Sequence, residues 1–284
     1  MALLDRLRTG IALTRDSLLL IRHHPSLALF PLVGGAAGLA FLGIFLGISF
    51  GVLLLTPDAT ILVVLFVLYL VLTFISTFFT AGLVHQTRAA LEGETPSLGA
   101  GLRGAWEVKG SLFIWALISA IIGVIINGIE NSDSRLSQMF ATIFGVAWTL
   151  LTFFVIPVIV FEQQSTKGMF KRSAGIFRET WGETPVSLIG VQIVSVLVLL
   201  PFALPAIYLF TMGFVIPAVT LILMGALLSF LLGQTLQGVV KTTLYLYAAN
   251  GEKPEEFDDI DFNNLAADRP SATRVTSTTT GGFR

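Results

Sequence analysis

Six long apolar runs constrain this chain more than any other feature of its sequence. Each is close to or above the roughly 20 residues that a helix needs to cross a bilayer. We place the runs at 27–55, 61–85, 111–129, 138–161, 186–209 and 214–240. Because backbone amides in hydrocarbon must be hydrogen-bonded within their own segment, we expect every run to be helical. The sequence therefore predicts an all-α integral membrane protein with six transmembrane helices.

The composition supports this fold class and excludes several others. Hydrophobic residues make up 54% of the 284 residues and charged residues only 12%, whereas about 25% of the residues of a typical soluble domain are charged. The chain has no cysteine, which excludes disulfides and cysteine-ligated metals. Its formal net charge of −1 gives no reason to expect nucleic acid as a partner. The first apolar run begins too late for a cleavable signal peptide.

The distribution of basic residues predicts an orientation. If the N-terminus lies inside the cell, all but one of the 17 Lys and Arg residues lie on the inner side, and the exception is Arg135. Cytoplasmic loops of membrane proteins carry such an excess of positive charge. We therefore expect a multi-pass protein of the cell membrane whose N-terminus and C-terminus are both cytoplasmic.

A charged, amphipathic stretch followed by two apolar runs recurs three times along the chain. These stretches precede the first, third and fifth runs, and they end at Pro25, Gly110 and Pro185. We therefore predict three pseudo-repeats, at about 1–90, 95–162 and 165–250, each a surface helix plus a transmembrane hairpin. Together they form one membrane domain over 1–250. An acidic and then Thr-rich cytoplasmic tail follows at 251–284.

The amphipathic stretches carry a basic face opposite an apolar face. Helices of this kind lie in the membrane interface, with their cations toward anionic headgroups. We therefore predict three cytoplasmic interfacial helices. The residues expected at the lipid headgroups and the interface are Arg8, Arg15, Arg22, Lys171, Arg172, Arg178 and Trp181. Two interpretations remain open, because these helices could only anchor the hairpins or could also have a regulatory or lipid-sensing role.

The sequence offers little material for catalysis. The three histidines, His23, His24 and His85, lie at the inner ends of apolar runs, and the adjacent pair cannot share a helical face with metal-ligand spacing. No metalloprotease, P-loop or nucleophile-elbow motif is present. The carboxylates cluster in the tail rather than in the spans, so no buried acid–base pair can be assembled. We expect no enzymatic activity, no metal site and no cofactor.

A few polar residues within or beside the spans are candidates for a polar cavity or a gate. They are Glu162, Gln192, Gln234 and Gln237. Glu162 follows Pro157, where we expect a kink, and its alternative interpretation is an interfacial residue paired with Lys167 or Lys171. The glutamines lie near the inner ends of the fifth and sixth runs. They either hydrogen-bond between helices or line a cavity open to the cytoplasm.

Three glycines in the first run, Gly43, Gly47 and Gly51, are four residues apart. Glycines at this spacing form a smooth ridge against which another helix can pack closely. The partner helix could belong to the same chain or to a second copy in a homo-oligomer, and the sequence leaves both possibilities open.

The end of the fourth run resembles a known motif. The motif consists of Pro157, Glu162, Lys171, Arg172, Ser173 and Trp181, followed by a new span. It is similar to a motif in the membrane domain of glycerophosphodiester phosphodiesterases and to several uncharacterised prokaryotic multi-pass families. The end of the last run, TTLYLYAANGEKPEEF, resembles the close of one such family. The soluble phosphodiesterase domain is missing, so the resemblance implies a membrane module of unknown role and not that activity.

These features favour a non-catalytic membrane module that organises lipids or partner proteins at the inner membrane surface. The expected partners are anionic membrane lipids, and either a second copy of the chain or another membrane protein. The alternative is a channel or an uncoupled transporter for a small neutral solute, since the spans contain almost no ionisable side chain that could couple transport to an ion. A continuous polar cavity would favour transport, and a dry core would favour the module.

Overall fold

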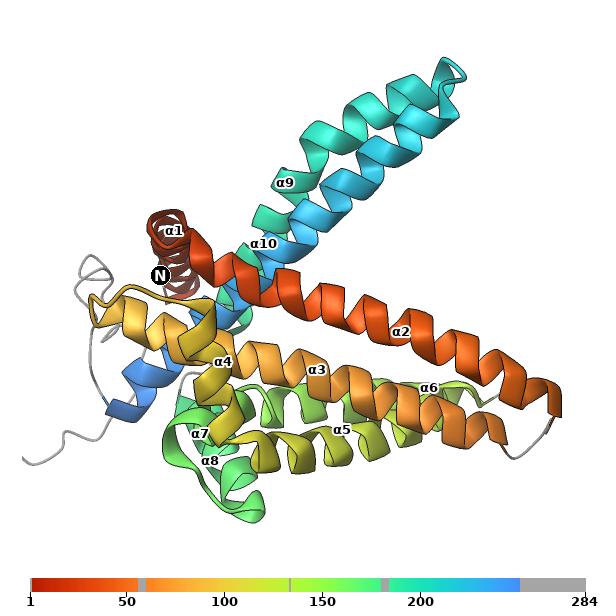
Figure 1. The fold of residues 1–284 in the computed structure, drawn as a ribbon. Coiled ribbons are helices and arrows are strands. Elements are labelled where there is room, and N and C mark those ends of the chain that lie inside the picture. Colours follow the sequence, from red (N-terminus) through yellow and green to blue (C-terminus); the bar gives the residue numbers. More distant parts are fainter. Residues whose placement is uncertain (1, 56–59, 133, 180–183, 251–284) are drawn as a thin grey trace, which may run out of the picture.

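The computed structural model describes residues 2–55, 60–132, 134–179 and 184–250, and within these ranges the regular structure is helical throughout (Figure 1). The first part of the chain forms α1 (Ala2–His23), the 3₁₀ turn η1 (Pro25–Ala28), α2 (Leu29–Leu55) and α3 (Thr60–Leu91). The middle part forms α4 (Leu98–Glu107), α5 (Lys109–Glu130), α6 (Arg135–Leu151) and α7 (Val155–Glu162). The last part forms α8 (Thr166–Glu179), α9 (Thr184–Thr211) and α10 (Val215–Asn250). The prediction of an all-α fold is confirmed.

Six helical segments are long and apolar enough to cross a membrane. They are Pro25–Ser49, Val63–Leu91, Lys109–Glu130, Arg135–Glu162, Gly190–Thr211 and Val215–Ala249. Each overlaps one of the six apolar runs predicted from the sequence, which supports a multi-pass membrane protein. The observed segments extend beyond the predicted runs mainly where polar residues continue the helix, as α3 does past His85.

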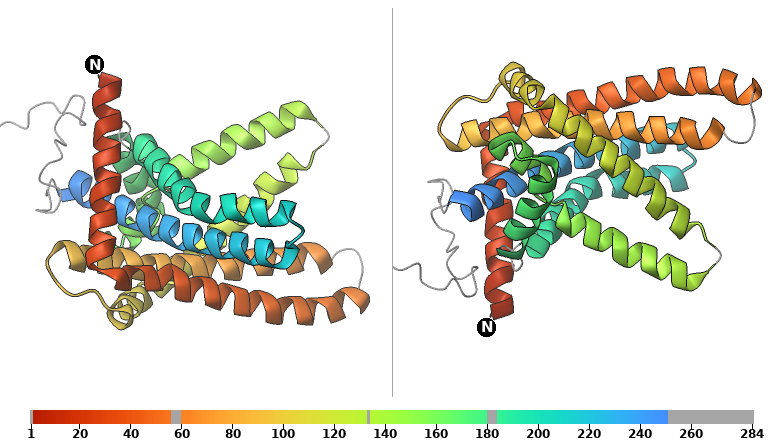
Figure 2. Two further views of the ribbon diagram at one scale, coloured as in Figure 1. Left: turned by 90° about the horizontal axis from the view of Figure 1, so that it is seen from above. Right: turned by 90° about the horizontal axis from the view of Figure 1, so that it is seen from below.

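Three long hairpins diverge from one end of the molecule: α2–α3, α5–α6 and α9–α10 (Figures 1 and 2). Buried side chains from all three parts of the chain gather at this end, which we call the hub. Its members include Leu13, Leu20, Phe30, Leu83, Leu112, Phe154, Ile159, Ile176, Leu236 and Leu244. By contrast, only 6% of the residues in the most apolar windows of α2, α3 and α9 are buried. The hairpins are therefore joined mainly at the hub.

Glycines allow the helices to approach one another closely in the hub. The ring of Phe30 is fully buried and lies against Gly82 of α3 and Gly101 of α4. A Cβ atom at Gly82 would lie 2.8 Å from this ring, and one at Gly101 would overlap it. Larger residues at these two positions would therefore push α2 away from α3 and α4.

The fourth span is interrupted between α6 and α7. The helix ends at Leu151 and resumes at Val155. Pro157 favours a break in this part of the helix, because proline cannot donate a hydrogen bond to the carbonyl of Phe153 and its ring would collide with that group in a continuous helix. The sequence predicted a kink at Pro157, and the structure places an interruption just before it.

The apolar face of α8 packs against other helices of the protein. Phe170 lies 5.8 Å from Trp115 of α5 and 5.7 Å from Trp148 of α6, measured between ring centroids. Ile176 and Phe177 are buried in the hub. The sequence analysis assigned this face to the membrane interface, but the structure covers it with protein, because the turn after α7 folds α8 back onto the hairpin that precedes it.

Candidate functional site

Glu162 joins three helices at the edge of the hub. One carboxylate oxygen, Oε1, accepts a hydrogen bond from Arg172 Nε of α8 at 2.7 Å and another from Tyr245 Oη of α10 at 2.8 Å. The Glu162 side chain is 20% exposed and that of Arg172 is 38% exposed. We call these three residues the carboxylate node. Because Arg172 of α8 and Tyr245 of α10 both donate to the Glu162 carboxylate, the node holds the end of α7 against α8 and α10.

The backbone just after Glu162 places Arg172 within reach. Gln163 has the left-handed conformation (φ 47°, ψ 39°), and it is the one non-glycine residue with positive φ among the described residues. Such a conformation is unfavourable by on the order of 1 kcal/mol for a residue with a Cβ. The hydroxyl of Ser165 then accepts a hydrogen bond from the Gly168 N–H at 3.3 Å and caps α8. This turn reverses the chain so that α8 runs back along α7.

The ion-pair partner of Glu162 differs from the sequence prediction. Lys167 or Lys171 was the predicted partner, whereas in the structure Glu162 pairs with Arg172. Lys167 and Lys171 are exposed on α8. Arg172, which was predicted to lie at the lipid headgroups, therefore contacts a carboxylate of the protein with its guanidinium and is not directed to lipid alone.

Ser173, next to Arg172, forms hydrogen bonds with backbone groups at the interruption of the fourth span. Its hydroxyl donates a hydrogen bond to the carbonyl of Leu151 at 2.7 Å and accepts one from the N–H of Phe154 at 3.1 Å. Both backbone groups lost their helical partners at the break, and such groups must be satisfied inside a membrane protein. Pro157, Glu162, Arg172 and Ser173 of the sequence motif thus form one structural unit in which α8 is fixed to the broken span.

Aromatic and charged side chains surround the carboxylate node. The rings of Phe161 and Tyr245 stack at 5.3 Å, and the guanidinium of Arg88 lies 5.5 Å from the Phe161 centroid. A cavity of about 350 Å³ lies beside them and is lined in part by His85, Arg88 and Glu107. Across the described ranges, no group of three His, Cys, Asp or Glu residues stands close enough to hold a metal ion.

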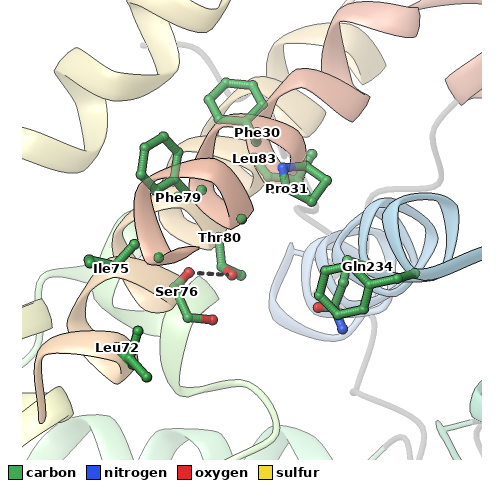
Figure 3. A pocket seen from close by; sticks show the side chains of 13 residues that line it. Phe30, Pro31, Leu72, Ile75, Ser76, Phe79, Thr80, Leu83 and Gln234 are labelled. Carbon is green, nitrogen blue, oxygen red and sulfur yellow. Dashed lines mark hydrogen bonds between the residues drawn. The ribbon is translucent and has the colours of Figure 1, made fainter. Parts of the chain in front are cut away.

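A second feature is a groove between α2, α3 and α10, with a cavity of about 170 Å³. Most of its lining is apolar or glycine, and its polar side chains come from Ser76, Thr80 and Gln234. Figure 3 shows Gln234 on α10 facing Ser76 and Thr80 on α3. The Thr80 hydroxyl donates to the carbonyl of Ser76 at 2.8 Å, so it is satisfied within its own helix. We call this cavity and its walls the groove.

The structure separates the glutamines that the sequence analysis grouped together. Gln234 and Gln192 are both exposed, but Gln234 lines the groove, whereas Gln192 lies on α9 and is not among the lining residues. Gln237 is partly buried one turn further along α10. In the part of the chain that the structure describes, Gln192 and Gln234 form no hydrogen bond with each other.

The glycine ridge of the first span does not contact another helix at the two positions that can be assessed. A Cβ atom at Gly43 or Gly47 would meet nothing within 4 Å. Of Gly51 only the helical backbone is described. The contact between α2 and α3 instead uses Gly34, where a Cβ would lie 2.9 Å from Phe79.

The basic residues assigned to lipid headgroups are exposed where their side chains are described. Arg15 and Arg22 on α1 and Lys171 and Arg178 on α8 are all at the surface. Of Arg8 only the helical backbone is described, and Trp181 and the tail at 251–284 lie outside the described residues.

Sequence reasoning missed Tyr245 and Ser76. Tyr245 lies 83 residues from Glu162, and nothing in its neighbourhood marks it as a carboxylate partner. Ser76 lies among apolar residues of α3, where a single hydroxyl is usually satisfied by its own helix. Only the packing of α10 against α3 shows that Ser76 and Gln234 face the same space.

Comparison with known proteins places the chain in a family. No curated protein matches it. The model of a family of unknown function, DUF6159, matches residues 59–255, which is more than half of the chain and includes the whole carboxylate node. This match confirms the predicted resemblance to a family of unknown function. The predicted resemblance to phosphodiesterase membrane domains stays a prediction. The chain belongs to the family of unknown function DUF6159.

Proposed function

We propose that this protein is a non-catalytic module of the cell membrane that organises lipids or partner proteins at the inner membrane surface. The observation that carries the proposal is the joining of three apolar hairpins mainly at the hub. Away from the hub, the spans leave much of their apolar surface uncovered by the protein itself, since only 6% to 33% of the residues in their most apolar windows are buried. In a bilayer, lipid chains or the spans of another protein must cover these surfaces.

The exposed cations support an interaction with anionic lipid. Arg15 and Arg22 lie on α1, and Lys171 and Arg178 lie on α8, which are the two longer helices outside the six spans. Each Lys or Arg near an anionic surface contributes about 1 kcal/mol of binding free energy. In this proposal, α1 and α8 lie at the membrane interface, as predicted from the sequence. Their basic faces point toward the headgroups and their apolar faces toward the hub.

The arrangement of cavities favours the module over a channel or an uncoupled transporter. The groove, the cavity beside the carboxylate node and a third cavity of about 520 Å³ between α3, α5 and α6 share no lining residue. A pore requires a polar path from one side of the membrane to the other. The third cavity, with Ser119, Glu130 and Thr142 in its lining, is the feature that a transport function would use.

Removing exposed cations from α8 should weaken retention of anionic lipid. We expect Lys171→Ala and Arg178→Ala each to lower phosphatidylglycerol retention about fivefold, since each cation contributes about 1 kcal/mol. The measurement is mass spectrometry of lipid retained by protein purified from mixed phosphatidylglycerol and phosphatidylcholine vesicles. Arg135→Ala is the matched control, because Arg135 is exposed at the start of α6, at the distal end of its hairpin. Equal retention by all variants would contradict the proposal, and glycerol flux through the vesicles would favour transport.

Single cysteines should report the proposed orientation. The chain has no native cysteine, so each introduced thiol is the one reactive site. We expect Ser132→Cys, between α5 and α6, to react with a membrane-impermeant maleimide on intact cells. Thr95→Cys, between α3 and α4, should react only after the membrane is permeabilised. The opposite pattern would place the basic faces on the outside and would contradict the proposed location.

A further inference from the structure

The groove lies within the membrane-spanning part of the protein. All of its lining residues belong to three of the candidate spans, Pro25–Ser49, Val63–Leu91 and Val215–Ala249. One wall is flattened by Gly34, Gly35 and Gly38 of α2, and a Cβ atom at Gly35 would meet nothing within 4 Å. Open space along α2 is therefore found at Gly35, whereas Phe79 packs against Gly34 and Leu72 lies near Gly38.

Two exposed polar side chains in the groove have no hydrogen-bond partner among the described residues. Neither the amide of Gln234 nor the hydroxyl of Ser76 makes a hydrogen bond among the described residues, although the Ser76 carbonyl accepts one from Thr80. A polar group surrounded by hydrocarbon is unfavourable by several kcal/mol unless it is hydrogen-bonded. The groove therefore presents a donor and acceptor pair to whatever occupies it.

The groove lies at the depth of the part of one leaflet that is nearest its headgroups. Gln234 is seven residues from Lys241 on α10, which is roughly 10 Å at the rise of an α-helix. Thr80 is eight residues from Arg88 on α3, which is roughly 12 Å. Since the hydrocarbon core of a whole bilayer is about 30 Å thick, the groove lies in the leaflet next to the hub, within reach of the ester groups of that leaflet and of the acyl chains that follow them.

The chemistry and size of the groove limit its occupant. No charged side chain lines it, so it offers nothing to a phosphate or carboxylate. A single acyl chain is thin enough to enter a cavity of about 170 Å³. The occupant must combine an apolar chain with a neutral hydrogen-bonding group.

We propose that the groove is a binding site for a bilayer glycerolipid. An acyl chain lies along the wall of α2 in the open space beside Gly35. An ester carbonyl of the same lipid accepts a hydrogen bond from the Gln234 amide, and the Ser76 hydroxyl can donate a second one. This inference rests on the proposed function and extends it, because it names one defined lipid site between two hairpins in place of general contact with the bilayer.

Photolabelling of the full-length protein tests the site. The probe is phosphatidylcholine with a diazirine in the upper part of one acyl chain, included in phosphatidylcholine vesicles. After illumination, the label on the 72–83 segment of α3 is measured relative to the label on the outward face of α9. Gln234→Leu should lower this ratio about fivefold, the equivalent of one neutral hydrogen bond. Gly35→Leu should lower it at least as much, because a Cβ atom there meets nothing within 4 Å and the leucine side chain would extend into the open space.

Each variant has a matched control on the same kind of surface. Gln192→Leu removes an exposed glutamine of α9, and Gly47→Leu fills open space on α2 away from the groove. Neither should change the ratio. The same ratio in every variant would overturn the lipid site, as would a protein–protein crosslink through the groove, which would show a second chain there. If the labelling ratio does not depend on the groove but phosphatidylglycerol retention depends on the basic faces, the lipid site is wrong and the proposed function stands. If the ratio depends on the groove but retention does not depend on the basic faces, the lipid site stands and the proposed role of the basic faces is wrong.

Discussion

Phe30→Ala should lower the free energy of unfolding by about 3–5 kcal/mol, the range for truncating a fully buried phenylalanine. The Phe30 ring is 0% exposed and touches α3 and α4 at glycines that cannot fill the space left behind. The cavity would open between helices from two parts of the chain, where the surrounding backbone has little freedom to collapse. Reversible unfolding in mixed micelles by a denaturing detergent measures the change.

The control for this prediction is Phe140→Ala on α6. Phe140 is 63% exposed, so its truncation leaves no internal cavity, and we expect a change within about 0.5 kcal/mol. Similar losses for the two variants would show that the hub does not dominate stability. A loss confined to Phe30→Ala would show that the joined end holds the hairpins together.

Breaking the carboxylate node should destabilise the protein by about 1.5–3 kcal/mol, the range for hydrogen bonds to charged groups. Glu162→Gln keeps the shape of the side chain but removes the charge that accepts hydrogen bonds from Arg172 and Tyr245. A double-mutant cycle with Arg172→Met isolates the pairwise contribution. We expect it to exceed about 1 kcal/mol, because the carboxylate is largely shielded and is also held by Tyr245.

The chain contains a matched pair for this cycle. Arg88 and Glu92 are also joined Nε to Oε1 at 2.7 Å, but their side chains are 44% and 52% exposed. Exposed pairs four residues apart on a helix contribute about 0.3–0.5 kcal/mol. If the two cycles gave the same coupling energy, the carboxylate node would be no more than a surface ion pair, and its role in fixing α7 would be wrong.

The spans could be predicted from the sequence because hydrophobicity and length determine them locally. Every predicted run overlaps an observed apolar helix. The kink at Pro157 could be predicted for the same reason, since the missing donor is a property of that residue. The site of the interruption could not, because it depends on Ser173, 22 residues from Leu151, supplying the replacement hydrogen bonds.

The partner of Glu162 could not be chosen correctly from spacing. Lys167, Lys171 and Arg172 are all close in the sequence, and the left-handed turn at Gln163 decides which of them faces α7. Glutamine gives no signal for that conformation, which glycine and asparagine adopt more readily. Tyr245 and the groove depend on how α10 packs against the other hairpins, which is long-range information that hydropathy does not contain.

The joining of the hairpins at the hub has a consequence for how the protein is made. Each hairpin can enter the membrane as it leaves the ribosome, because an apolar helical pair is stable in lipid before it meets other helices. The hub, however, includes Leu236 and Leu244 from α10, which are among the last residues of the membrane domain to be synthesised. Its closure is therefore a late, post-insertion step that brings together residues more than 200 positions apart. Until α10 arrives, the nascent chain is a set of separately inserted hairpins in which the buried face of α8 is still open.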